Sequence, residues 1–477
     1  MNNHSEKLLQ KEWKLTQLGL LLFPLLPTLG TLSLILATIS TWKQKWRRII
    51  RLPHNIALAG LGVWLAIATI FAHDRQEAVL GLANLLPFFA VFAAFSTLIQ
   101  RPSQLRRLSW MMVISSVPVV ILGFGQLFLG WSGPLHLQII FGWMLAPQGN
   151  PPGRMASVFM YANILAIYLT VVFILGLGLW LELWKGYPPN PPLKGGLKQV
   201  AHWVKSLGVN LDKRLKRFRN NSPVTSTSTA NPPNPSKGEL KIVKNLALEK
   251  FLFLFLTVAV ILNGVALILT NSRNAWGLVV FAGLAYAVYL GWRWLVGLVI
   301  TAVATVFGAA FTPAPLREWL RVIVPEYFWA RLTDRDFDRP FAILRSTQWQ
   351  FAWNMTLEKP LSGWGLRNFT PLYEAQMQMW LGHPHNLLLM LTAETGIPAA
   401  LFLFGWVGWI LAKAGLFLIN WSVVYSRGER LIFFSYLVAF GACTIFNMFD
   451  VTLFDLRVNT MGWLLLAAIC GVSDRLK

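Results

Sequence analysis

The stretch MASVFMYANILAIYLTVVFILGLGLWLELW, residues 155–184, carries one charged side chain, Glu182. A helix rises about 1.5 Å per residue, so about 20 apolar residues cross the ~30 Å hydrocarbon layer of a membrane. The stretch exceeds that length, and we predict that it spans a bilayer as a helix.

Similar apolar runs recur along the whole chain. Of its 477 residues, 55% are hydrophobic and 13% are charged, whereas soluble domains carry ~25% charged residues. This composition excludes a cytoplasmic globular enzyme and a disordered or fibrous chain. We predict an all-α polytopic membrane protein with about eleven or twelve transmembrane helices. Ten spans are predicted at 53–72, 77–99, 108–130, 155–184, 247–270, 275–291, 294–312, 386–412, 430–449 and 457–474, and a further apolar stretch covers 16–41.

The basic residues predict the orientation. The net charge is +22, and Lys and Arg cluster between apolar runs, where they mark cytoplasmic loops and attract anionic headgroups. Membrane lipids, and no nucleic acid, are therefore the expected partners of this charge. Segment 185–250 holds thirteen Lys and Arg against three acids and is predicted to lie inside. The basic-poor connections, and the large loop 313–385, then face outward.

The N-terminal stretch leaves two topologies open. Basic residues place both the N-terminus and the 42–52 connection inside, yet residues 16–41 are too short for two full spans. They form either a bent hairpin around Pro24 and Pro27 or a single crossing with the N-terminus outside. Without a small-x-small cleavage site, the stretch is expected to be an anchor.

Composition divides the chain further. Linker residues rich in Pro, Asn and Ser cannot bury a core, whereas a loop of about seventy residues with helical patterning near 341–357 is typical of a functional loop. We predict N-terminal transmembrane helices at 1–184, a basic cytoplasmic linker at 185–246, transmembrane helices at 247–312, a large, partly helical periplasmic loop with active-site residues at 313–385, and C-terminal transmembrane helices at 386–477.

Three arginines stand at the predicted outer face. Arg273 follows Ser272 between two apolar runs, Arg345 opens the helical part of the loop, and Arg367 follows Gly363-Trp-Gly365. Each is compatible with an ordinary boundary or surface arginine. A guanidinium also binds phosphate oxygens bidentately, which would make Arg273 a ligand of an anionic headgroup.

The sequence His383-Pro-His385-Asn386 precedes a long apolar run. It is compatible with a simple helix cap, or with a general base, because the positive helix end favours a neutral imidazole. A metal site is disfavoured because no third ligand recurs at helpful spacing, and no cofactor is expected. Glu394 follows about 14 Å along an ideal helix; an acid at that depth is functional or paired with a polar neighbour.

An Asp-x-Asp-x-Asp run offers another possible cation site. Arginines interleave with its carboxylates, which favours a self-neutralised surface instead. The acids are Asp334, Asp336 and Asp338, and the arginines are Arg331, Arg335 and Arg339.

Taken in order, these motifs resemble the O-antigen ligase/polymerase superfamily of bacterial membrane proteins. The resemblance covers roughly residues 145–470. It is carried by Gly153-Arg154, Asn163, Ser272-Arg273, Arg345, Pro360-Leu-Ser-Gly363-Trp-Gly365, His385-Asn386 and Glu394-Thr-Gly396.

The resemblance implies a glycosyltransferase at the outer face of the bacterial inner membrane, which uses neither metal nor nucleotide sugar. Such enzymes move a glycan from a polyprenyl diphosphate carrier to lipid A–core, in ligases, or to a second carrier-linked glycan, in polymerases. Arg273 and Arg345 would hold the diphosphate, and His385 would contact or deprotonate the acceptor hydroxyl. Arg154, Asn163, Arg367, His383 and Glu394 would bind substrate.

Two departures from the superfamily pattern concern helix geometry. Asn274 stands where a small residue is usual after Ser-Arg, and Pro384 precedes His385. The superfamily also includes cyanobacterial proteins described as inorganic-carbon transporters, so a bicarbonate transporter is the alternative function. A transporter should show ionisable residues inside broken spans. Here the polar groups gather outside the spans, which favours the enzyme.

Overall fold

The computed structural model describes residues 9–184, 237–333, 341–421 and 426–474, and all regular secondary structure within these ranges is helical. The chain divides into two compact units, Met1–Leu179 with Ala259–Lys477 and Trp180–Val258. In the second unit, the Trp180 ring stacks on Phe253, with centroids 5.8 Å apart, and its indole N–H donates to Thr257.

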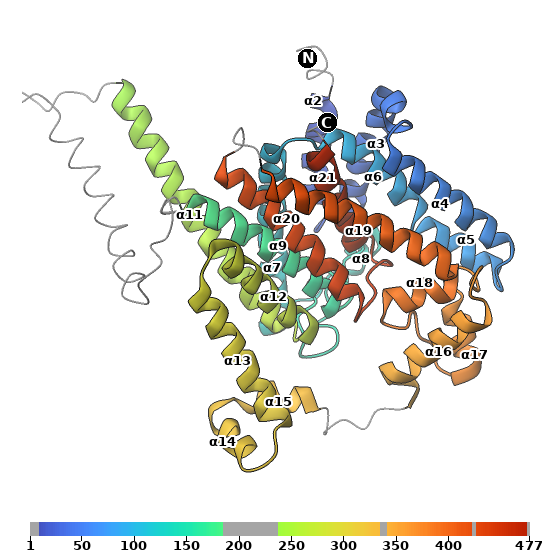
Figure 1. Cartoon of the computed structure of the whole chain (residues 1–477). Coiled ribbons are helices and arrows are strands. Elements are labelled where there is room, and N and C mark those ends of the chain that lie inside the picture. Colours follow the sequence, from blue (N-terminus) through green and yellow to red (C-terminus); the bar gives the residue numbers. More distant parts are fainter. Residues whose placement is uncertain (1–8, 185–236, 334–340, 422–425, 475–477) are drawn as a thin grey trace, which may run out of the picture. The chain divides into compact units, whose positions relative to one another are not determined.

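Within the described ranges, ten helices are long and apolar enough to cross a membrane. Each overlaps one of the predicted spans, so the protein is an all-α polytopic membrane protein (Figure 1). The spans are α4 (Pro53–Ile70), α5 with α6 (Arg75–Ala83, Leu86–Leu98), α7 (Pro102–Phe128), α9 (Ala162–Leu183), the apolar part of α11 (Lys237–Leu269), α12 (Arg273–Leu290), α13 (Arg293–Phe311), α19 (Ile397–Ile419), α20 (Arg427–Asn447) and α21 (Leu456–Ser473).

The N-terminal stretch forms a helical hairpin, the first of the two predicted alternatives. Helix α2 (Gln10–Leu22) packs antiparallel against α3 (Pro27–Ile49). Gly30 makes this possible near the tip, because a Cβ there would lie 2.6 Å from the Cα of Phe23. At the other end, the buried carboxylate of Glu12 accepts a hydrogen bond from Ser40 at 2.5 Å.

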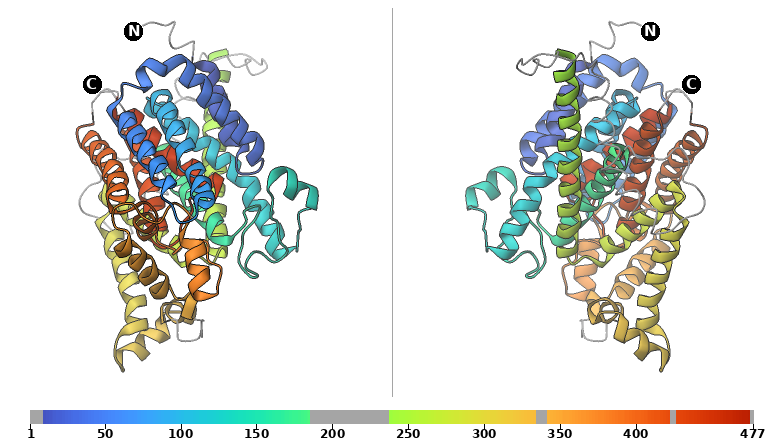
Figure 2. Two further views of the ribbon diagram at one scale, coloured as in Figure 1. Left: turned by 90° about the vertical axis from the view of Figure 1, so that its right-hand side faces the viewer. Right: turned by 90° about the vertical axis from the view of Figure 1, so that its left-hand side faces the viewer.

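The burial of the spans separates central helices from lipid-facing ones. The apolar window of α21 is 89% buried, and that of α13 is 11% buried. Helix α21 packs against α6, α19 and α20 (Figure 2). Gly471 lets α21 approach α6 closely, because a Cβ would lie 2.2 Å from the carbonyl oxygen of Ile99. Helix α13 therefore exposes most of its apolar surface to the bilayer.

The predicted span 386–412 is interrupted. It consists of a short helix α18 (Leu387–Thr395), a break at Gly396 with φ of +81°, and the membrane helix α19. The carbonyl oxygen of Leu361 fills the space where a side chain at Gly396 would stand. Glu394 therefore lies in the last turn of a short helix outside the ten spans, and not deep within a span as its spacing predicted.

The predicted outer loops contain helices of their own. Helix α16 confirms the helical patterning expected near 341–357, and Arg345 is its first residue. Residues 334–340, with the predicted Asp-x-Asp-x-Asp run, and residues 185–236 of the predicted linker lie outside the described ranges. The loop elements are α8 (Leu135–Phe141), α14 (Leu316–Ile323), α15 (Glu326–Thr333), the 3-10 helix η1 (Phe341–Ile343), α16 (Arg345–Glu358) and α17 (Phe369–Met377).

Candidate active site

The turn that carries His385 has a well-defined conformation. The side chain of Asn386 caps α18 by accepting a hydrogen bond from the Leu389 amide at 3.0 Å. His385 has a φ of +53°, a conformation that costs a non-glycine residue about 1–3 kcal/mol and persists only where the surroundings hold it. The surrounding structure thus holds the His385 ring in a defined place at the start of the helix.

A buried carboxylate that the sequence analysis did not single out meets this ring. Asp450 follows α20, and its Oδ1 lies 2.8 Å from Nδ1 of His385. Its side chain is 8% exposed, whereas that of His385 is 29% exposed. The pair therefore has a buried acidic end and an accessible imidazole end.

His383 lies against the same pair. Its Nε2 is 3.8 Å from Oδ1 of Asp450, and its Nδ1 accepts a hydrogen bond from the backbone N–H of His385 at 3.1 Å. Burial lowers the pKa of His383 to about 4. Electrostatic repulsion from His385 and Arg345 also lowers this pKa, and the negative charge of Asp450 raises it without cancelling the effect. His383 is thus neutral near neutral pH.

The other oxygen of Asp450 joins the carboxylate to a second chain of polar groups. Asn163 donates to Oδ2 of Asp450 at 2.6 Å, and Arg154 donates to the Asn163 carbonyl at 2.5 Å. The Nε of Arg154 also donates to the backbone oxygen of Thr270 at 2.8 Å. The motifs around residues 154, 163 and 385, far apart in sequence, therefore converge on one carboxylate.

These contacts determine the protonation of the pair. Burial opposes ionisation of Asp450, but the hydrogen bond and the electrostatic attraction of His385 outweigh it and hold the pKa of Asp450 below its ordinary value. An ionised carboxylate only accepts hydrogen bonds, so Nδ1 of His385 carries the proton. In the neutral form of His385, Nε2 is then the nitrogen without a proton, and it can take one from a substrate.

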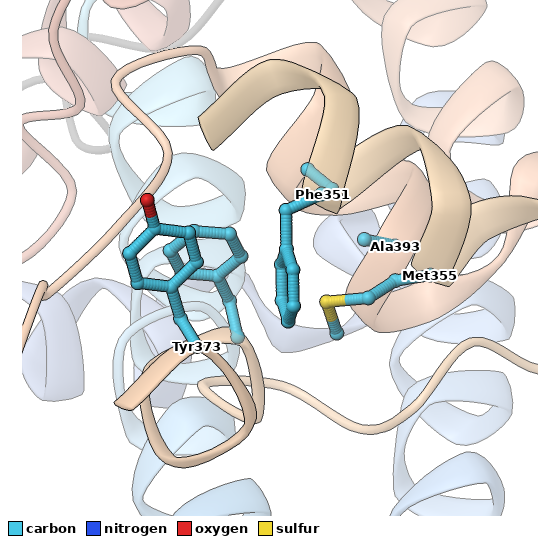
Figure 3. Close-up of a cluster of buried hydrophobic side chains, with 6 residues drawn as sticks. Phe351, Met355, Tyr373 and Ala393 are labelled. Carbon is cyan, nitrogen blue, oxygen red and sulfur yellow. The ribbon is translucent and has the colours of Figure 1, made fainter. Parts of the chain in front are cut away.

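Arg345 is positioned by a small core of its own. Phe351 and Met355 of α16 pack against Tyr373 of α17 and Ala393 of α18 (Figure 3). The Tyr373 hydroxyl donates to the carbonyl oxygen of Ala342, just before α16, at 2.6 Å. Helix α16 is thereby held on the helix that follows His385. Arg345, exposed at its first position, lies near enough for its charge to lower the pKa of His383.

Arg273 is the first residue of α12 and is exposed. It stands three residues after Thr270, whose carbonyl oxygen is bound by Arg154. The preceding Asn271 has a φ of +53°. Arg154 therefore ties the turn that leads to Arg273 to the Asp450 network.

Arg367 has a φ of +61° and lies in the predicted turn. Its guanidinium forms a 2.7 Å ion pair with Glu77, in which both side chains are about a third exposed, at 38% and 33%. It also approaches the Phe454 ring, at 5.9 Å from the centroid, while His383 stacks on that ring at 5.9 Å. Arg367 thus borders the site through Phe454.

The buried Glu394 makes its contacts with the loop 363–369. Its carboxylate accepts from the Phe369 amide at 3.4 Å, and its backbone oxygen accepts from the Gly365 amide at 2.9 Å. Burial raises the pKa of Glu394 to about 8, against the smaller lowering effects of Arg367 and Phe369. These contacts make Glu394 the point where the Gly-Trp-Gly loop joins α18.

An apolar cavity of about 120 Å³ opens beside the segment between α20 and α21, which carries Asp450. Leu387 and Leu391 of α18 line it on one side, and Asn447 and Thr452 flank Asp450 in the chain. Most of the remaining wall comes from side chains of α19, α20 and α21, such as Phe404, Phe440 and Trp463. The polar cluster therefore lies next to an apolar space between membrane helices.

His383, His385 and Asp450 could also hold a metal ion, because their ligand atoms lie within 4.8 Å of one another. The spacing in sequence pointed to no third ligand near the two histidines. Asp450 supplies one, so the fold brings together a candidate metal site that the spacing of the two histidines did not predict.

Comparison with known proteins agrees with the motifs. A family model described as O-antigen ligase matches residues 258–404, a region that includes Arg273, Arg345 and His385. No curated protein matches the chain. This match agrees with the O-antigen ligase/polymerase superfamily that the motifs resemble.

Proposed function

We propose that this protein transfers a glycan from a polyprenyl diphosphate carrier to an acceptor hydroxyl at the periplasmic face of a bacterial inner membrane. The observation that carries the proposal is the 2.8 Å contact between His385 and the buried Asp450. A carboxylate that holds Nδ1–H leaves Nε2 in a fixed direction, as in other histidine bases oriented by an acid.

In the proposed step, the acceptor oxygen bonds to the anomeric carbon of the glycan while the bond from that carbon to the diphosphate oxygen breaks. The acceptor proton passes to Nε2 of His385. The electron pair leaves with the polyprenyl diphosphate, whose added negative charge needs cations. Arg345 and Arg273 would supply fixed positive charge there, which stabilises a transition state in which charge develops.

The remaining residues have supporting roles in this proposal. Asn163 and Arg154 hold Asp450 and, through Thr270, the turn that precedes Arg273. The apolar cavity between α18 and α21 would take the part of the polyprenyl chain nearest the diphosphate. Arg367 would border the substrate from across the Phe454 ring, and Glu394 would act by supporting the loop.

The test is a transfer assay with purified protein in proteoliposomes and a carrier-linked glycan. His385→Ala should lower turnover by roughly 10²–10⁴-fold, the usual contribution of a general base. Arg345→Ala should lower it on the order of a hundredfold, and Arg345→Lys should restore only part, because lysine cannot bind a phosphate bidentately. Near-normal turnover by His385→Ala at equal protein levels would leave the histidine as a turn residue only.

The same assay with excess EDTA addresses the metal alternative, and we expect activity to persist. Loss of activity in EDTA, restored by a divalent cation, would instead make His383, His385 and Asp450 a metal centre. Surface polysaccharide from a deletion strain separates the two acceptor classes. Chains lost from lipid A indicate a ligase, whereas shortened chains indicate a polymerase.

A further inference from the structure

Helix α14 has its apolar side turned away from the protein. Leu316, Trp319 and Ile323 are 54%, 73% and 73% exposed. Their spacing of three and four residues places them on one stripe of the helix. Val322, at the edge of this stripe, is 86% exposed. A surface helix of a soluble domain normally buries such a stripe against its core.

The other side of α14 makes the contacts with the protein. Arg321 donates to the carbonyl oxygen of Ala309 at 3.0 Å, and its guanidinium lies 3.7 Å from the centroid of the Trp329 ring in α15. The polar residues Arg317 and Glu318 lie beside Arg321 on the helix surface. Glu318 is exposed, unlike Arg321, so α14 presents both an apolar stripe and a polar edge to its surroundings. This arrangement is typical of a helix at a boundary between lipid and water.

The position of α14 relative to α13 identifies those surroundings. Leu320 lies against Gly308 in the last turn of α13, since a Cβ on Gly308 would meet the Leu320 side chain at 2.6 Å. Helix α14 therefore folds back beside the end of a membrane span (Figure 1). Phe307 and Phe311 in that end are 53% and 60% exposed, so α14 with its apolar stripe lies beside an exposed apolar end of α13.

We propose that α14 is an interfacial helix that lies in the bilayer surface at the C-terminal end of α13, with Leu316, Trp319 and Ile323 among the lipid chains. A helix of eight residues is too short to span a bilayer, but a helix with a large apolar face binds at the headgroup–acyl boundary. Tryptophan is the residue most typical of that depth.

This anchoring has a consequence for the neighbouring helices. Helix α15 follows α14 and places Phe328 edge-on against Trp276, with ring centroids 6.2 Å apart. Trp276 lies in the first turn of α12, three residues after Arg273. The lipid surface would therefore hold α14, α15 and the start of α12 at one level of the membrane.

The test uses nitroxide labels on the full-length protein in phospholipid nanodiscs. Ile323→Cys places a label on the apolar stripe, and Glu318→Cys places a control on the opposite side of the same helix. Oxygen concentrates in lipid and a nickel chelate in water, so their effects on the spectra report the environment of each label. Cys443 and Cys470 are buried, and the unsubstituted protein gives the labelling background.

We expect the label at 323 to collide severalfold more with oxygen than with nickel, and the label at 318 to show the reverse preference. Equal access of nickel to both labels would place α14 in water and overturn the proposal. A label at 323 shielded from both reagents would mean that protein, such as a second copy of the chain, covers the stripe, and would overturn it equally. Normal expression and a single species on size exclusion show that both variants are folded.

Discussion

At the scale of single residues, the contact with Asp450 is what would make His385 an oriented base. Without it, His385 would be a histidine that faces solvent. Asp450→Asn keeps the size of the side chain but removes the charge that fixes the proton on Nδ1 of His385. We expect turnover to fall on the order of a hundredfold or more, with little change in substrate affinity. The measurement is kcat and KM in the transfer assay.

Asp455→Asn is the matched control, because Asp455 belongs to the same connection but caps α21 by accepting from the Arg457 and Val458 amides. An asparagine oxygen keeps this cap, so the main loss is the 3.3 Å ion pair with Arg457. The substitution should lower stability and leave turnover per folded molecule unchanged. Equal loss of turnover in both variants would show that the Asp450 effect is structural.

Glu394 predicts a dependence of stability on pH. Burial raises its pKa from 4.5 to about 8, so the folded protein holds a proton that the unfolded chain releases. The stability associated with this proton is fully present below about pH 4.5 and is lost as pH rises through about 8. Glu394→Gln, which cannot ionise, should therefore raise the melting temperature at pH 8 relative to wild type and have little effect at pH 5.

Thermal unfolding in detergent at several pH values measures this difference. The underlying free energy is a few kcal/mol at most by the linkage relation. Glu374→Gln, a substitution of an exposed acid on α17, is the control and should follow wild type throughout. A melting difference between Glu394→Gln and wild type that stays constant with pH would mean that Glu394 is ionised in the folded protein.

At the scale of elements, the break between α18 and α19 is what joins the loop to the membrane helices. Gly396→Ala would impose a Cβ 2.3 Å from the carbonyl oxygen of Leu361, at a φ of +81°. The strained backbone alone costs about 1–3 kcal/mol. We expect a melting temperature several degrees lower and reduced turnover, because α18 positions His385.

Gly408→Ala in α19 is the comparison, since a Cβ there meets open space. In a helix interior this change should stabilise the protein by about 0.5–1 kcal/mol. If Gly396→Ala behaved like Gly408→Ala, the loop would not be docked at the break.

The elements also show what could be predicted from sequence. Each of the ten predicted spans overlaps a helix long and apolar enough to cross a membrane, because hydropathy over twenty residues is a local property. Arg345 as the opening residue of a helix was likewise local. The partner of His385 was not, since Asp450 lies 65 residues further on and approaches only after packing brings their two connections together. The sequence did predict that the connections carrying His385 and Asp450 both face outward. That prediction could not show which of the acids in the outward connections pairs with His385.

The interruption at Gly396 was missed for a related reason. The residues on both sides are apolar, so the pattern reads as one continuous run. The break depends on the Leu361 backbone entering the space beside Gly396, a contact with a distant segment. The same contact explains why the acid at 394 is found at a helix end.

At the scale of the whole molecule, the proposed site requires that the loop with His385 faces outward while the basic segment 186–240 faces the cytoplasm. The alternation of basic and basic-poor connections supports this orientation.

Thr333, at the end of α15, belongs to the predicted outer loop, and Ser226 to the predicted inner segment. A cysteine at 333 should therefore react with an impermeant thiol reagent on intact spheroplasts, and a cysteine at 226 only after the membrane is permeabilised. The two native cysteines are buried, so the unsubstituted chain should show little labelling. Reaction at 226 without reaction at 333 would show that the protein has the opposite orientation. His385 and Asp450 would then lie on the cytoplasmic side, and a periplasmic carrier-linked glycan could not be the substrate.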